Sequence, residues 1–144
     1  MSDLGRSRRQ YSIFLFYLSN TISALGPQHR SLADRVSYLN KALNSVDLYH
    51  EVELPTIFFL DHPLGSVLGR ARYSDFFSFS QNCTVGNNNG VYPRLGENVS
   101  MMSGATVLGD CDIGSHWFSP PTAMSKTRAS RLARSCLARL RTSL

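Results

Sequence analysis

An apolar residue at every sixth position is the feature that most restricts how this chain can fold. The spacing runs through residues 67–113 in two registers, which are offset by the turn-forming run at 87–90. The first register comprises Val67, Tyr73, Phe79 and Val85, and the second comprises Leu95, Met101, Val107 and Ile113. A six-residue period is typical of a parallel β-helix, in which about 18 residues complete one coil of three short strands. We therefore predict a mainly β fold, a truncated parallel β-helix of about three to four coils; an antiparallel β domain is the alternative.

Small side chains follow most of these apolar positions by four residues. They are Ala71, Cys83, Ala105 and Cys111, with the larger Val99 in the same series. The interior of such a coil is narrow, so we expect small residues where its wall bends. Cys83 and Cys111 are therefore predicted to be core residues. The three cysteines are widely spaced and form no Cys-x-x-Cys pair, so we expect no metal site and a reducing, cytoplasmic location.

Two helices are predicted ahead of the repeat. The first covers residues 11–25 and ends at a Gly-Pro pair, and the second covers residues 31–48 with Ser31 as its N-cap. An apolar stripe follows the second helix through Leu32, Val36, Leu39, Leu43 and Val46. Arg8-Arg9 before the first helix is only a loose match to an export signal, because the apolar stretch is short. The expected organisation is a helical segment (1–48), the β-helix (49–118) and a basic tail (119–144).

Positive charge lies outside the predicted folded body. The 144 residues carry a net charge of +5, yet six of the 15 basic residues lie beyond residue 125 and three lie within the first ten. Residues 11–125 hold six basic and nine acidic residues, a balance near −3. A nucleic-acid surface needs basic residues on the body itself, so we expect no nucleic-acid partner. The chain also lacks an apolar run of about 20 residues, so we expect no membrane span.

Several motifs in the repeat resemble one enzyme family. They are Asp61-His62-Pro63-Leu64-Gly65-Ser66-Val67-Leu68-Gly69, Asn82-Cys83-Thr84-Val85-Gly86, Tyr92-Pro93-Arg94-Leu95-Gly96 and Val107-Leu108-Gly109-Asp110. In this order they resemble the bacterial serine O-acetyltransferases, over roughly residues 45–116. The resemblance implies a hexapeptide-repeat, left-handed β-helix preceded by helices, with acetyl-CoA as co-substrate and a small hydroxyl compound as acceptor. It also implies a homotrimer with active sites between neighbouring chains, and a place in cysteine biosynthesis.

The same resemblance implies roles for single residues. His62 follows an aspartate and matches the family's catalytic histidine, and Asp47, fifteen residues upstream, matches the carboxylate that orients it. Asp61 is the expected acceptor-binding group. An imidazole with a pKa near ~6.5 can take a proton from a hydroxyl that attacks a thioester, and a carboxylate stabilises the resulting imidazolium. The remaining histidines, His29, His50 and His116, are expected to be surface or packing residues.

The residues expected to bind the cofactor and the acceptor match the family less closely. Gly86, Asn88 and Ala105 are expected to contact acetyl-CoA, and residues 86–88 lie where the family has a glycine-rich loop whose N–H groups face the thioester. Tyr92, expected to bind substrate, stands where the family has a second histidine, and Val91 replaces an arginine suited to the acceptor's carboxylate. Serine O-acetylation is therefore the first hypothesis. A sugar O-acetyltransferase of the same fold and a non-catalytic relic are the alternatives.

The repeat is expected to lose its pattern after Ile113. The next apolar position, residue 119, is a serine, and Trp117 occupies a position that requires a small side chain. Residues 117–143, reread from the third base of each codon, can yield an ending like that of the family. We therefore hypothesise a frameshift near residues 116–117, which would remove part of the wall that binds acetyl-CoA and weaken or abolish activity.

Overall fold

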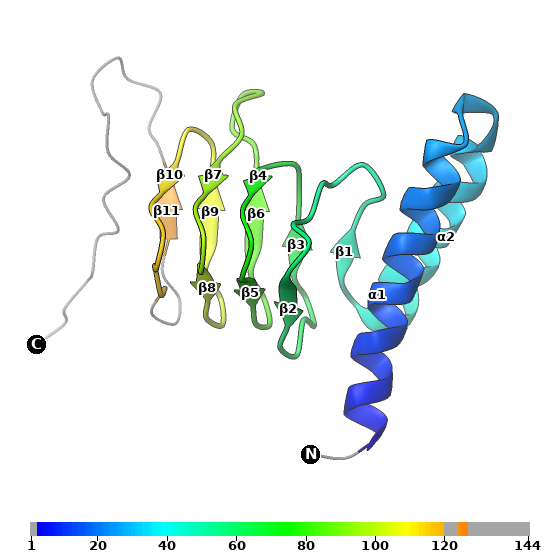
Figure 1. Ribbon diagram of the computed structural model, residues 1–144, viewed down its shortest axis with the longest axis horizontal. Helices are drawn as coiled ribbons and strands as arrows, with labels where there is room; N and C mark the ends of the chain where they lie inside the picture. Colours follow the sequence, from blue (N-terminus) through cyan, green and yellow to red (C-terminus); the bar gives the residue numbers. More distant parts are fainter. Residues whose placement is uncertain (1–2, 120–123, 127–144) are drawn as a thin grey trace, which may run out of the picture.

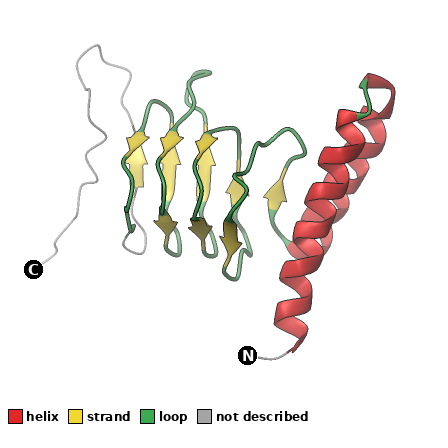
Figure 2. Ribbon diagram, in the orientation of Figure 1, coloured by secondary structure: helices red, strands yellow, loops and turns green. Residues whose placement is uncertain are grey.

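The computed structural model describes residues 3–119 and 124–126, and it shows a β-helix with a pair of helices against one end (Figure 1). The helical part comprises α1 (Asp3–Ala24), a 3-10 turn η1 (Pro27–His29) and α2 (Arg30–Asn44). Within the described ranges, no helix is long and apolar enough to cross a membrane. The helices lie side by side across the first coil, and the strands stack away from them (Figure 2).

Three parallel sheets form the walls of the β-helix. Sheet A comprises β1 (Asp47–Leu48), β3 (Val67–Leu68), β6 (Thr84–Gly86), β9 (Thr106–Leu108) and β11 (Met124–Lys126). Sheet B comprises β2 (Phe58–Leu60), β5 (Phe77–Phe79) and β8 (Ser100–Met101). Sheet C comprises β4 (Arg72–Tyr73), β7 (Arg94–Leu95) and β10 (Asp112–Ile113). Each coil runs from sheet B through sheet A to sheet C, and about three turns are completed. The predicted left-handed parallel β-helix is thus confirmed.

Seven of the eight predicted apolar positions lie in the core. They are Tyr73, Phe79, Val85, Leu95, Met101, Val107 and Ile113. The exception is Val67, whose side chain faces outward while Leu68 is buried and lies in register with Val85. Eight positions separate Leu60 from Leu68, whereas six separate the equivalent Phe79 and Val85. The first turn from sheet B to sheet A is therefore two residues longer than the next one, and the prediction for Val67 was wrong by one residue.

Small residues occupy the bends as predicted. Cys83, Val99, Ala105 and Cys111 are buried, and Ala71 is partly buried. Burial raises the pKa of the Cys83 thiol, which keeps it protonated and unreactive. Cys83 and Cys111 are free thiols of the core, which confirms their predicted role.

The break between the two registers is a short hairpin that leaves the coil. Asn88 and Val91 exchange backbone hydrogen bonds of 3.0 and 3.1 Å. Asn89 and Gly90 between them have φ of 53° and 80°, the left-handed pair that a two-residue hairpin turn requires. The four extra residues are thereby accommodated outside the wall, and the strands on either side keep their pairing.

The helices differ from their predicted limits. The first begins at Asp3 instead of residue 11, and the second ends at Asn44 instead of residue 48. Ser45 has a left-handed backbone and closes α2 by donating its N–H to the Lys41 carbonyl. The chain then enters the first strand of sheet A. Ser31 is not the N-cap, because His29 holds that position without a side-chain hydrogen bond.

The predicted apolar stripe is only partly buried: Val46 lies beyond the end of α2 in the core, and Val36 is half-buried. The helices pack through small and polar side chains, and Asn40 both accepts from and donates to Ser12 at 3.0 Å. Ala33 and Ser37 are buried in the same seam. Leu32, Leu39 and Leu43 remain between 42% and 55% exposed. The 3.6-residue pattern therefore identified a helix, but these three leucines do not lie on the side that packs in a single chain.

The coil continues past the point where the pattern was expected to fail. Ser119 takes the next interior position and is buried, and its hydroxyl accepts a hydrogen bond from the Met102 N–H at 2.7 Å. Trp117 packs against the core from a partly buried position, and β11 pairs with β9. A buried serine replaces an apolar anchor here because a backbone N–H satisfies its hydroxyl. Residues 120–123 and 127–144, which include most of the predicted tail, lie outside the described residues.

Candidate active site around His62

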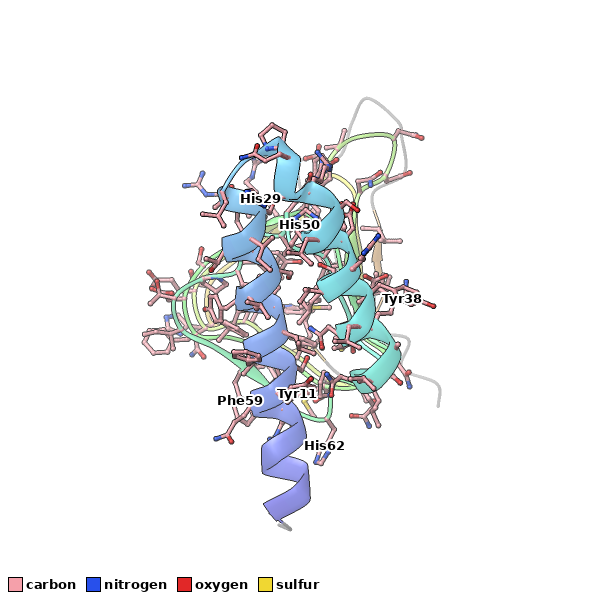
Figure 3. The ribbon with its side chains drawn as sticks, turned by 90° about the vertical axis from the view of Figure 1, so that its right-hand side faces the viewer. Tyr11, His29, Tyr38, His50, Phe59 and His62 are labelled. Carbon is pink, nitrogen blue, oxygen red and sulfur yellow. The ribbon has the colours of Figure 1, made fainter. Side chains whose placement is uncertain are left out.

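His62 lies in the long first turn between sheets B and A. The two additional residues of this turn carry the chain outward after Leu60, and His62 adopts φ of 51°. The turn is held because Asp61 donates its N–H to the Phe79 carbonyl and Leu64 donates to the His62 carbonyl. The His62 side chain is 66% exposed. It lies toward the end of the helical pair where α1 begins, whereas His50 and His29 lie toward the opposite end (Figure 3).

A carboxylate and a guanidinium lie beside this imidazole. Asp61 Oδ1 is 3.7 Å from His62 Nε2 and also 3.7 Å from Arg9 Nη1. Arg9 comes from α1, where its side chain is 13% exposed. Its guanidinium donates to the Leu60 carbonyl at 3.4 Å and lies over the Phe59 ring, 5.3 Å from the ring centre. These contacts fix Arg9 against the start of the His62 turn.

A pocket of about 220 Å³ opens next to these groups. Its wall consists of Arg9, Ser12, Leu43, Asn44, His62, Pro63 and Leu64. It therefore lies where both helices meet the first turn of the β-helix. The wall combines apolar surface with an imidazole, a guanidinium and a hydroxyl, which suits a small polar molecule more than a purely apolar one.

Asp47 lies on β1, where its carboxylate accepts a hydrogen bond from the Lys41 ammonium at 2.6 Å. This contact raises the pKa of Lys41. Among the described residues, no hydrogen bond or ion pair joins Asp47 to His62. The carboxylate next to the imidazole is that of Asp61. The orienting role of Asp47 stays a prediction.

Tyr92 and His62 lie near opposite ends of the strands of sheet A, at two different corners of the coil. His62 is in the turn that enters this sheet at β3, and Tyr92 is in the loop that leaves it after β6. Tyr92 is 40% exposed and close to Arg70, whose guanidinium also pairs with Glu51. A single chain therefore does not bring Tyr92 to the corner that holds His62.

The three residues predicted to contact the cofactor lie in or next to sheet A: Gly86 ends β6, Asn88 comes two residues after it, and Ala105 directly precedes β9. Gly86 and Asn88 are partly exposed, and Asn88 packs against Gly109 of the next coil. Ala105 is fully buried; its N–H donates to Met102 and its carbonyl accepts from Thr84. The side chain of Ala105 thus packs in the interior of the coil. Contact of these residues with acetyl-CoA stays a prediction.

Two features were not visible in the sequence. In the sequence Arg9 is one of three basic residues near the amino end, and nothing within α1 indicates that it meets Phe59 and Leu60, 50 and 51 positions later. Buried His50 donates its Nε2–H to the Asp34 carboxylate at 3.0 Å, and the Tyr49 hydroxyl donates to the same carboxylate at 2.6 Å. His50 is therefore a packing residue, as predicted.

Among the described residues, no group of three or more His, Cys, Asp or Glu side chains is placed to hold a metal ion.

No family model matches the chain, and no curated protein matches it. Solved structures do match in fold. A serine acetyltransferase from Vibrio cholerae O1 biovar El Tor N16961 has a TM-score of 0.66 at 18% identity, over 83% of this chain and 52% of that one. Isoform 3 from Entamoeba histolytica, in complex with cysteine, has a TM-score of 0.67 at 18% identity, over 89% and 51%.

The serine acetyltransferase from Brucella abortus strain S19, in complex with coenzyme A, has a TM-score of 0.66 at 17% identity, over 86% of this chain and 55% of that one. The chain thus spans about half the length of these proteins. At such identities the likeness shows a common fold, a left-handed β-helix with helices before it.

Proposed function

We propose that this chain is an acetyl-CoA-dependent O-acetyltransferase, similar in chemistry to serine O-acetyltransferases, with His62 as general base. The observation that carries the proposal is the exposed imidazole of His62, placed beside a carboxylate and a pocket on the fold of enzymes that act on serine. One of those neighbours was solved with coenzyme A, which supports acetyl-CoA as the co-substrate. The reaction that we propose requires no metal.

In the proposed reaction, a nitrogen of His62 accepts the proton of the acceptor hydroxyl. The hydroxyl oxygen attacks the thioester carbonyl of acetyl-CoA, and a tetrahedral oxyanion forms. Collapse of this intermediate breaks the C–S bond, and the departing thiolate takes the proton back from the imidazolium. In this proposal Asp61 stabilises the imidazolium or an acceptor amine, which the distance of 3.7 Å between its carboxylate and His62 Nε2 supports. Asp47 is the proposed orienting group for the ring.

The complete site in this proposal uses more than one chain. Within one chain the two residues lie near opposite ends of the sheet A strands. Tyr92 therefore reaches an acceptor at His62 only if a second copy of the chain brings its own Tyr92 loop to the His62 turn. A homotrimer with threefold symmetry supplies this arrangement at each of its interfaces. Gly86, Asn88 and the wall near Ala105 are proposed to form the acetyl-CoA side. A cytoplasmic location and a place in cysteine biosynthesis complete the proposal.

The proposal is tested by thiol release from acetyl-CoA with serine and a panel of sugars. We expect release with at least one acceptor, and a loss of about 100- to 10,000-fold in kcat/KM for His62→Ala. His116→Ala is the matched control, because His116 is also an exposed histidine in a coil turn with positive φ. Equal activity of His62→Ala and the parent protein would exclude His62 as the base.

The choice of acceptor distinguishes the alternatives. Release with sugars but not with serine would favour the sugar O-acetyltransferase, for which the exposed Val91 and Tyr92 offer an apolar and aromatic contact surface. A folded protein that releases no thiol with any acceptor is a relic. The hypothesis of a frameshift predicts that a frame-corrected chain binds acetyl-CoA more tightly than this one, which a titration of the two proteins compares directly.

A further inference from the structure

The hairpin between β6 and β7 carries an asparagine followed by a glycine at its tip. Figure 1 shows this loop projecting beyond the ends of the strands. Asn89 and Gly90 are both exposed. Apart from the chain neighbours of Gly90, no heavy atom lies within 4 Å of the position that its Cβ would take. The tip of the hairpin is thus open to solvent, and packing against the coil does not hold it.

An asparagine followed by glycine can lose its side-chain amide without an enzyme. The Gly90 nitrogen attacks Asn89 Cγ, the Cγ–Nδ2 bond breaks, and ammonia leaves with the proton of the attacking N–H. The product is a five-membered succinimide ring. Water then opens this ring at either carbonyl and gives aspartate or isoaspartate, whose backbone contains one additional methylene. Glycine favours the attack, because it has no side chain that shields its nitrogen.

Two other asparagines in turns of the coil provide an internal comparison. Asn82, Asn89 and Asn98 have nearly the same left-handed backbone, with φ of 56°, 53° and 55°. Closure of the ring requires rotation of the peptide that follows the asparagine. Cys83 and Val99, which follow the first and the third of these asparagines, are fully buried. Close packing of the interior opposes the rotation at these two turns, whereas the exposed tip of the hairpin is free of this restraint.

The hydrogen bonds of the attacking nitrogens differ in the same sense. The Cys83 N–H donates to Ser66 Oγ at 3.0 Å inside the coil. The Gly90 N–H donates to Asn87 Oδ1 at 3.5 Å, which is long for such a bond. Opening of the hairpin tip therefore costs one weak contact, and exposed loop tips open locally at a low free energy. Opening of the turn at Asn82 displaces a core residue.

We propose that Asn89 is a site of spontaneous deamidation, which converts the tip of this hairpin to aspartate or isoaspartate in the folded protein. The inference does not depend on the proposed function. Either product adds a negative charge to the loop. Isoaspartate also lengthens the backbone between Asn88 and Val91, and so alters the hydrogen bonds that join them. The modification thus changes the loop that carries Tyr92.

Peptide mass spectrometry tests the site in the full chain, aged in a mildly alkaline buffer and then cut with trypsin. Deamidation replaces an amino group by a hydroxyl group, and fragment ions assign the resulting mass gain to one asparagine. We expect Asn89 to react at least about tenfold faster than Asn82 or Asn98, since the rate follows the free energy of local opening. Equal rates at the three asparagines, or no mass gain at Asn89, would overturn the inference.

Two matched variants locate the reaction. Asn89→Gly removes the amide and leaves a Gly-Gly pair, which suits a two-residue hairpin turn. We expect the peptide that spans this turn to lose its mass gain in Asn89→Gly. Asn98→Gly is the control, because Asn98 is also exposed and has nearly the same φ, and this variant should keep the gain at Asn89. A gain of the same size in Asn89→Gly would place the reaction elsewhere.

Rates in urea separate a property of the structure from a property of the sequence. An Asn-Gly pair in an unfolded chain reacts without restraint from the fold. If the hairpin tip opens readily, Asn89 should react in the folded chain at a rate within about tenfold of its rate in urea. Stronger protection by folding would mean that the tip stays closed, and the inference would be wrong.

An effect of deamidation on catalysis rests on the proposed function, in which Tyr92 binds the acceptor. Aged parent protein should then have a higher KM for the acceptor than fresh protein, whereas aged Asn89→Gly should match its fresh form. Deamidation at Asn89 without thiol release from acetyl-CoA would retain the modification site and exclude the proposed function. Thiol release without deamidation would retain the proposed function and exclude the modification.

Discussion

His62, Phe76 and His116 all have a left-handed backbone, with φ of 51°, 62° and 58°. This conformation is uncommon for residues with a Cβ, yet it recurs in the turns of this coil. Positive φ alone therefore does not distinguish His62 from a structural residue. The distinguishing property is the long turn, because its two extra residues place the imidazole outside the repeat and beside the Asp61 carboxylate.

Leu68 and Val67 offer a direct test of this local register. Leu68→Ala should lower the free energy of unfolding by about 2–5 kcal/mol, because it leaves a cavity in a packed interior. Val67→Ala should change it by about 0.5 kcal/mol or less, since its side chain faces outward. Urea unfolding of both variants at one protein concentration measures the difference. A larger loss for Val67→Ala would mean that the regular six-residue step holds in the first turn.

The helical pair is attached to the β-helix by hydrogen bonds from both helices to the residues that follow β1. Asp34 on α2 accepts hydrogen bonds from the Tyr49 hydroxyl and His50, which follow β1. The same region is tied to α1, because the Asn20 side chain donates to the His50 carbonyl at 2.8 Å. These contacts hold both helices across the first coil, and that position brings Arg9 to the His62 turn.

Stability at low pH should report the Asp34 contact. The hydrogen bond from Tyr49, followed by that from His50, lowers the pKa of Asp34. A lowered carboxyl pKa stabilises the fold above the unfolded value of about 3.9, and this contribution is lost as the pH falls through the folded pKa. The difference in unfolding midpoint between the parent protein and Asp34→Asn should therefore be constant above about pH 5 and shrink below about pH 4.

Arg30 and Glu51 lie near this contact and are present in both proteins, as is His50, which donates to Asp34. Asp112→Asn is the control, because its carboxylate is 73% exposed and lies in another part of the coil. A difference between parent and Asp34→Asn that stays the same from pH 7 to pH 3 would contradict a stabilising role for ionised Asp34.

At the scale of the whole molecule, the proposed site is incomplete in one chain. Tyr92 and His62 lie at different corners of the coil, and three leucines of α2, Leu32, Leu39 and Leu43, remain exposed. We expect a homotrimer, with a mass in solution of about three times 16.0 kDa by light scattering. Thiol release should fall on dilution wherever the trimer dissociates. A monomer with full activity would contradict a site shared between chains.

Much of the coil could be predicted because its determinants are close together in sequence. The six-residue spacing, the small residues such as Cys83 and Ala105 at the bends, and the break at residues 87–90 each depend on a few neighbouring positions. A narrow interior accepts one set of side-chain sizes, so the sequence alone determined the β-helix and most of its core. The resemblance of short motifs to a known family led to His62 and Asp61 for the same reason.

Only the tertiary structure decided the register of Leu68, the outward position of the three exposed leucines of α2 and the position of Arg9. Each depends on packing between segments far apart in the chain, where small residues such as Ala33 and Ser37 allow close approach that hydrophobicity does not signal. The Asp47 carboxylate, in contrast, meets Lys41, which lies only six positions earlier in the chain. The spacing along the chain indicates which residues repeat. Contacts between distant elements depend instead on the complementary shapes of whole surfaces, which no single side chain determines.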